Sequence, residues 1–248
     1  MIAGNLQSIL QKLPSGVQLV AVSKFHPVEQ IREAYAAGQR VFAESRPQEL
    51  AAKVPQMPAD VQWHFIGHLQ TNKLKLVLPY VSLVQSVDSL HLLEAIKSWA
   101  LANNRTVDVL LELHLGAEQT KQGFTETEIL EILAGEGMGS QTCGHPRPHK
   151  REGPVRQDGR GREATVCEPI PSPAIRICGL MGMATNTEDM SVVERDFERI
   201  EALFRKIQAM GFPNFTELSI GMSGDWPVAV RHGATMVRIG TDIFGPRV

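Results

Sequence analysis

A lysine at position 24 directly follows a strand-like apolar run, in the stretch LVAVSKFHP (19–27). A lysine amine held against apolar walls has a lowered pKa, which makes it a nucleophile that forms a Schiff base with a carbonyl carbon. The plain alternative is a lysine that caps the strand and reaches water. The position of Lys24 alone does not decide between these two interpretations.

Two glycine-containing turns follow the last two expected strands, in the stretches SIGMSGDW (219–226) and RIGTDIFG (238–245). Their backbone amides and their serine and threonine hydroxyls are typical ligands of a phosphate group. The alternative is that both are simple tight turns. An amine on one side and an anion site on the other would suit an aldehyde that also carries a phosphate.

Short β-branched runs alternate with helical patterns along most of the chain. Near-continuous apolar runs are typical of parallel strands covered on both faces. Eight such runs in 248 residues predict a (β/α)8 TIM barrel. A doubly wound open sheet is the competing architecture, but it predicts a glycine-rich loop after the first strand, and SKFHPVEQ contains no glycine. The expected strands lie near 17–23, 40–43, 62–66, 81–87, 107–115, 175–182, 216–220 and 235–239.

Two helices have clear end signals. The segment 27–37 begins at a proline and ends before Gly38. The segment 191–210 opens with a predicted capping box, in which Ser191 is the N-cap and Glu194 is its partner. In a barrel, the residues just after each strand meet at one mouth, so Lys24 and the two glycine turns are expected to lie close together.

The segment 135–173 breaks the alternation, because it is rich in Gly, Pro and Arg and has few apolar residues. We expect a flexible insertion in a single domain that spans 1–248. It follows a helix near 125–134 and precedes the sixth strand, so it should leave the barrel at the face opposite the mouth. Two cysteines and two histidines in it match no compact zinc motif, and we predict no metal site: Cys143, His145, His149 and Cys167.

The bulk composition excludes several classes of protein. A formal net charge of −2 gives no reason to expect nucleic acid or an anionic membrane as a partner. No apolar run approaches the length of a membrane span, and the first residues lack the pattern of a signal peptide. Three cysteines form no disulfide framework, so we expect a cytoplasmic protein.

Three residues inside or after strands have plain structural interpretations. Cys178 is expected to be a small buried apolar residue, and His64 a hydrogen-bonded core residue. His68 lies nearer the mouth, where it either supports the site or caps a loop.

Six stretches together resemble the pyridoxal 5′-phosphate (PLP) homeostasis proteins, a single-domain family related to the N-terminal barrel of alanine racemase. The resemblance covers nearly the whole chain except 135–173. The stretches are AVSKFHP, HFIGHLQTNK, VQSVDS, GLMGMATN, LSIGMSGDW and GATMVRIGTDIFGPR.

The resemblance implies a fold-type III-like barrel that holds PLP as an aldimine on Lys24. It implies phosphate contacts from Ser223, Gly240 and Thr241, and an arginine, Arg238, near the pyridine nitrogen. Three methionines are expected to pack against the barrel top and the cofactor ring: Met181, Met183 and Met222. PLP-dependent apoenzymes would be the recipients, and the family suggests a monomer or weak dimer.

The chain departs from the family pattern after its second strand. Many members carry Gly-Glu-Asn there, whereas this chain has Ala43, Glu44 and Ser45. We therefore assign Ser45 no role at the cofactor.

Three functions compete: a PLP carrier or regulator, a PLP-dependent amino-acid racemase, and a cofactor-free Schiff-base aldolase. A racemase needs a second base opposite the lysine, and the two tyrosines, Tyr35 and Tyr80, are expected far from the mouth. An arginine beside the pyridine nitrogen, here Arg238, weakens the ring as an electron sink. An aldolase would need Glu44 or Asp88 beside the amine. We therefore predict a carrier without catalytic residues.

Overall fold

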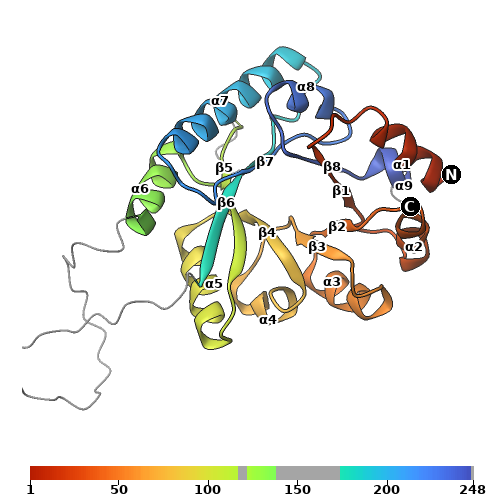
Figure 1. The fold of residues 1–248 in the computed structure, drawn as a ribbon, viewed down its shortest axis with the longest axis horizontal. Helices are drawn as coiled ribbons and strands as arrows, with labels where there is room; N and C mark the ends of the chain where they lie inside the picture. The colour runs from red at the N-terminus through yellow and green to blue at the C-terminus, as the bar shows by residue number, and fades with distance from the viewer. Residues whose placement is uncertain (117–121, 138–173, 247–248) are drawn as a thin grey trace, which may run out of the picture.

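Eight parallel strands close into a barrel in the computed structural model, which describes residues 1–116, 122–137 and 174–246. The strands pair in chain order, and β1 also pairs with β8, so the predicted (β/α)8 barrel is confirmed and the open sheet is wrong (Figure 1). The strands are β1 (Gln18–Val22), β2 (Val41–Glu44), β3 (Gln62–Phe65), β4 (Val81–Val87), β5 (Val107–Leu113), β6 (Ile175–Gly182), β7 (Glu217–Ser219) and β8 (Met236–Ile239).

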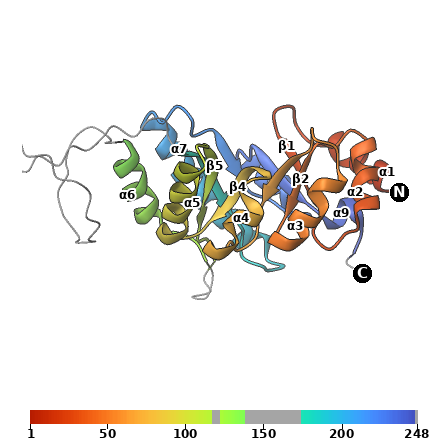
Figure 2. The same ribbon diagram turned by 90° about the horizontal axis from the view of Figure 1, so that it is seen from below.

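Helices surround the strands on the outside of the barrel, and two views at right angles agree on this arrangement (Figures 1 and 2). The first and last helices lie side by side, where Asn5 Nδ2 donates a hydrogen bond to Ile243 O at 3.1 Å. The helices are α1 (Ile2–Leu10), α2 (Val28–Ala36), α3 (Pro47–Lys53), α4 (Leu74–Val77), α5 (Leu90–Ala102), α6 (Glu126–Gly137), α7 (Met190–Ala209), α8 (Trp226–Arg231) and α9 (Thr241–Phe244), with 3-10 turns η1 (Val54–Gln56) and η2 (Thr71–Lys73).

The alternation of side chains along each strand separates two apolar layers. Residues such as Phe42 and Phe65 face the helices and belong to the larger outer core. The barrel interior is a smaller cluster of fully or largely buried side chains. Its members are Val20, Val22, Val41, Ala43, Leu83, Leu110, Met181 and Met236.

The capping box predicted for the seventh helix is wrong. The helix α7 begins at Met190, and its N-cap is Asp189, whose carboxylate accepts a hydrogen bond from Ser191 N at 2.9 Å. Two good capping residues lie two positions apart here, and the aspartate takes the role because it precedes the first helical turn.

The boundary predicted for the insertion also shifts. Helix α6 continues through Gly137, three residues past its expected end at 134. The rest of that segment, 138–173, and with it the four residues considered for zinc, lies outside the described residues. Within the described part of the chain, no helix combines the length and the apolar character needed to cross a membrane.

Candidate functional site

The residues predicted for the cofactor site line one cavity of about 230 Å³ at the C-terminal ends of the strands. Lys24 reaches it from the end of β1, and the two glycine turns reach it after β7 and β8. The predicted residues that line the cavity are Lys24, Met181, Met183, Met222, Ser223, Arg238, Gly240 and Thr241.

Apolar side chains form part of the cavity wall beside Lys24. Val22 and Met181 are buried, and Ile66 packs against the same interior cluster. His26 completes this side of the wall, where its ring stacks on Phe244 with the ring centres 4.9 Å apart. The wall therefore offers flat and apolar surface next to an amine.

Arg238 provides a fixed positive charge at the cavity. Its side chain is buried, and Nη1 donates to the carbonyl and the hydroxyl of Ser219, each at 2.7 Å. Nη2 donates to Gly182 O at 2.8 Å. Burial lowers the pKa of Arg238 to about 10, so the guanidinium remains charged at neutral pH. Three acceptors hold this cation in one orientation.

A chain of hydrogen bonds runs from Arg238 through the barrel interior. Because the guanidinium only donates, the Ser219 hydroxyl accepts from it and gives its own proton to Gln85 Oε1 at 2.7 Å. Gln85 Nε2 then donates to His64 Nδ1 at 2.8 Å. His64 must therefore be neutral and carry its proton on Nε2. Burial lowers the pKa of His64 to about 4, which agrees with a neutral ring.

The turn after β7 depends on a glycine and an aspartate. Gly221 has a φ of +91°, and a Cβ there would lie 2.6 Å from the Cβ of Ala229. Asp225 Oδ1 accepts a hydrogen bond from Met222 N at 2.5 Å, which fixes the turn. The chain can therefore pass close to the cavity at this point.

The amides of both glycine turns include groups that are available to a ligand. Within residues 1–116, 122–137 and 174–246, no acceptor pairs with the backbone N–H of Ser223, Gly224 or Thr241. These residues all line the cavity. Amide donors together with the Ser223 and Thr241 hydroxyls provide the donor set that an anion requires.

The two acidic residues that an aldolase would need beside Lys24 lie elsewhere. Glu44 is fully buried between β2 and α3, where its carboxylate lies 2.7 Å from Lys53 Nζ. Asp88 accepts a hydrogen bond from His68 Nδ1 at 2.9 Å, joining the segments after β3 and β4. Neither carboxylate lines the cavity.

The two tyrosines lie toward the N-terminal end of the barrel. Tyr35 donates a hydrogen bond to Asp60 at 2.7 Å, and Asp60 lies two residues before the start of β3. Tyr80 directly precedes β4. The mouth is at the opposite end of these strands, so neither tyrosine faces the cavity.

The structural roles predicted for His64 and Cys178 have different outcomes. The prediction that His64 is a hydrogen-bonded core residue is confirmed by its contact with Gln85. The prediction that Cys178 is buried is wrong, because its side chain is only partly buried and lines an opening at the N-terminal end of the barrel. The β6 strand bulges at this point, which turns Cys178 toward the opening. Burial of its sulfur raises the pKa of the Cys178 thiol to about 11.

Glu112 is an acidic group that the sequence analysis did not single out. It lies near the end of β5, where its side chain is buried. Burial and the nearby Asp88 raise the pKa of Glu112 to about 7, while the charges of Arg238 and His68 oppose the shift. An acidic residue in an apolar strand is the signal that would have identified it.

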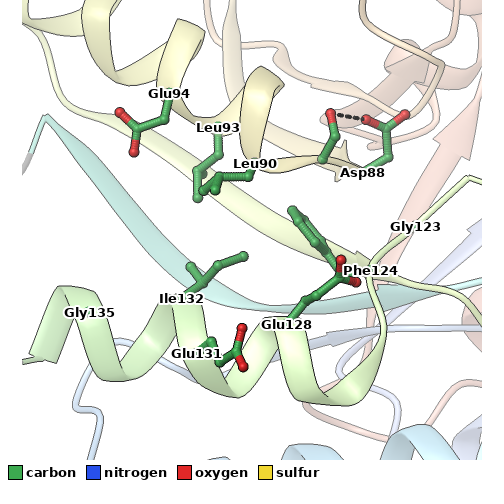
Figure 3. Close-up of a pocket in the computed structure, with 11 residues that line it drawn as sticks. Asp88, Leu90, Leu93, Glu94, Gly123, Phe124, Glu128, Glu131, Ile132 and Gly135 are labelled. Atoms are coloured by element: carbon green, nitrogen blue, oxygen red, sulfur yellow. Dashed lines mark hydrogen bonds between the residues drawn. The ribbon is translucent and has the colours of Figure 1, made fainter. Parts of the chain in front are cut away.

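A larger hollow of about 520 Å³ lies between α5 and α6 (Figure 3). Leu90 and Leu93 face Phe124 and Ile132 across it. Its described lining residues include acids but no lysine, histidine or cysteine, so it lacks a nucleophilic amine or thiol. In the described part of the chain, no group of three or more potential metal ligands occurs.

The fold and the cavity define a barrel of the kind found at the N-terminus of alanine racemase. Residues 1–136 match the family model described as alanine racemase, N-terminal domain. The alanine racemase of E. faecalis shares the fold, with a TM-score of 0.68 and 17% identity, and aligns with 99% of this chain and 57% of its own.

Relatives of higher identity identify the family. The pyridoxal phosphate homeostasis protein of Vibrio alginolyticus is 32% identical over 95% of this chain and 89% of its own length. PipY of Synechococcus elongatus PCC7942, solved with PLP bound, is 32% identical with a TM-score of 0.78, over 99% of this chain and 100% of its own. The chain belongs to the pyridoxal phosphate homeostasis protein family.

Proposed function

We propose that this protein binds PLP through Lys24 and takes part in PLP homeostasis inside the cell, without catalysing a reaction of its own. The observation that carries the proposal is the meeting of Lys24, Arg238 and two glycine turns at one cavity. PipY, which has been solved with PLP bound, is similar to this chain over nearly its whole length.

The chemical groups of PLP match the groups around the cavity. Its aldehyde supplies a carbon that a lysine amine can attack, and Lys24 is the lysine that lines the cavity. Ser223, Gly240 and Thr241 would hold the phosphate through their amides and hydroxyls. Met222 and the apolar wall would cover the ring.

Arg238 would lie beside the pyridine nitrogen. A permanent cation disfavours protonation of that nitrogen, and an unprotonated ring is a weak electron sink. Three hydrogen bonds hold Arg238 in its orientation, so this effect would be constant. The residue would favour storage of PLP over carbanion chemistry.

The side chains around the cavity also favour a carrier over an enzyme. A racemase needs a second base near the lysine, and Tyr35 and Tyr80 lie toward the other end of the barrel. The carboxylates that an aldolase would use, Glu44 and Asp88, are paired with Lys53 and His68 away from the cavity. We therefore propose that the protein delivers PLP to PLP-dependent apoenzymes.

Two measurements test this function. The PLP-loaded protein should reactivate an apoenzyme that depends on PLP, faster than the Lys24→Ala variant premixed with the same amount of PLP. The loaded protein should also leave the α-proton of L- and D-alanine unexchanged in deuterated water, as followed by NMR. Rapid exchange would instead indicate a racemase, and absence of bound PLP would contradict the proposal as a whole.

A further inference from the structure

Lys53, the last residue of α3, is a buried lysine with a complete set of acceptors. Its side chain is 7% exposed, and Nζ lies 2.7 Å from Glu44 Oε1, 2.6 Å from Glu49 Oε1 and 2.8 Å from Ser23 O. An ammonium group has three protons, so these three acceptors use all of them. Lys53 is therefore held in a single position.

This cluster binds the residues on both sides of Lys24. On one side, the Ser23 carbonyl accepts a hydrogen bond from Lys53 Nζ, and the Ser23 hydroxyl donates one to Glu44 Oε1 at 2.6 Å. On the other side, Phe25 N donates to Glu49 Oε1 at 2.7 Å. The backbone before and after Lys24 is thus attached to one group of charges behind the strand.

The backbone directly after Lys24 is strained, and the cluster offsets that strain. Phe25 has a φ of +68°, a left-handed conformation that is unfavourable for a residue with a side chain. The hydrogen bond to Glu49 holds its amide, and the Arg46 guanidinium lies 4.4 Å above its ring. The turn bends the chain sharply just beyond the lysine.

Burial of the charged groups in this cluster costs folding free energy. Glu44 Oε2 is buried and has no hydrogen-bond partner within the described residues. Burial raises the pKa of Glu44, although Lys53 and Ser23 act against that shift. Replacing buried ion pairs by apolar residues is often neutral or stabilising, so stability alone gives little reason for the cluster.

We propose that Lys53, with Glu49, is a positioning residue that presents Lys24 to the aldehyde of PLP. The inference rests on the proposed function. In the step concerned, the neutral Lys24 amine forms a C=N bond with the aldehyde carbon, and its two protons leave with the carbonyl oxygen as water. Lys53 takes no part in this exchange; it fixes the backbone from which the amine extends.

Comparing the binding of two ligands distinguishes a loss of Lys24 positioning from a general loosening of the cofactor site. PLP would bond to Lys24 and also contact the two glycine turns. Pyridoxine 5′-phosphate has an alcohol in place of the aldehyde, so it would contact the two glycine turns alone. Lys53→Met and Glu49→Ala should each weaken PLP binding by about tenfold or more and change pyridoxine 5′-phosphate binding by less than about twofold. Lys53→Arg, which keeps the charge, should recover part of the loss.

The controls keep the test decisive. Lys75→Met, at an exposed lysine of α4, should bind both ligands like the unmodified protein. If Lys53→Met does not fold, Glu49→Ala decides, because it leaves the pair of Lys53 and Glu44 intact. Equal losses of both ligands, or no loss of PLP, would overturn the inference. Failure of borohydride to trap PLP on Lys24 in the unmodified protein would overturn the proposed function instead.

Discussion

Arg238 Nη1 lies 2.7 Å from Ser219 Oγ, and this contact fixes the direction of a hydrogen-bond chain that ends at His64. The charged end of the chain lies at the cavity, and the neutral end lies toward the N-terminal opening. A proton added to His64 Nδ1 would face the N–H donor of Gln85 Nε2, so protonation of His64 must break this hydrogen bond.

The hydrogen-bond chain that ends at His64 predicts that the free energy of unfolding falls at acidic pH. The pKa of His64 is about 4 in the folded protein and 6.5 in the unfolded chain. The unfolded state therefore binds more protons in this window, and the free energy of unfolding should fall by about 3 kcal/mol as the pH drops from 6.5 to 4. His64→Asn keeps an acceptor but does not titrate, so its urea unfolding should lack this part of the decline. Parallel pH profiles for the two proteins would contradict the assignment.

Glu112 predicts the opposite dependence over a similar window. Its pKa is about 7 in the folded protein against an ordinary value of 4.5, so the folded state binds more protons between these values. The free energy of unfolding of the cofactor-free protein should fall by about 3 kcal/mol as the pH rises from 4.5 to 7. In Glu112→Gln this decline should disappear, as measured by urea unfolding at pH values on both sides of the window. An unchanged slope would mean that Glu112 is ionised in the folded protein.

Gly179 marks the closest contact between β6 and β7. A Cβ at this position would lie 1.7 Å from Glu217 O, so Gly179→Ala must separate the two strands. We expect it to lower the free energy of unfolding by about 3 kcal/mol or more. Gly4→Ala, in α1, adds a carbon that meets no atom within 4 Å beyond its chain neighbours and its own helix backbone, so it should raise the free energy of unfolding by about 0.5–1 kcal/mol. Similar effects of the two substitutions on urea unfolding would count against the barrel register.

The two glycine turns should contribute to PLP affinity without contributing to the covalent bond between PLP and Lys24. A hydrogen bond to a charged acceptor contributes about 1.5–3 kcal/mol, so Ser223→Ala and Thr241→Ala should each weaken PLP binding by about 10- to 150-fold. Binding of pyridoxal, which lacks the phosphate, should hardly change in either variant. If pyridoxal were lost as badly as PLP, the hydroxyls would support the barrel top and the phosphate site would lie elsewhere.

The sequence predicted the barrel and the cavity because both follow from regular features. Apolar runs of strand length determine the barrel, and the ends of parallel strands bring Lys24, Ser223 and Arg238 to one mouth. Strand alternation also places Glu44 on the outer side of β2 with Phe42, because Ala43 between them faces the barrel interior, so Glu44 points away from the cavity.

Other features depend on packing that the chain order does not reveal. Glu49 and Lys53 have the spacing of an ordinary surface ion pair, but the packing of α3 against β2 buries Lys53 and leaves Glu49 partly buried. The hydrogen bonds of Gln85 and Ser219 join strands that are 134 residues apart in the chain. The cap of α7 was missed because Asp189 and Ser191 are both good capping residues.

The attachment of PLP to Lys24 is the central claim, and borohydride reduction tests it most directly. Reduction of the PLP-loaded protein followed by mass mapping of its peptides should find a phosphopyridoxyl group on the peptide that contains Lys24, and the Lys24→Ala variant should remain unlabelled. A label on Lys73 or Lys75, or no label in a protein that is saturated with PLP, would contradict the account.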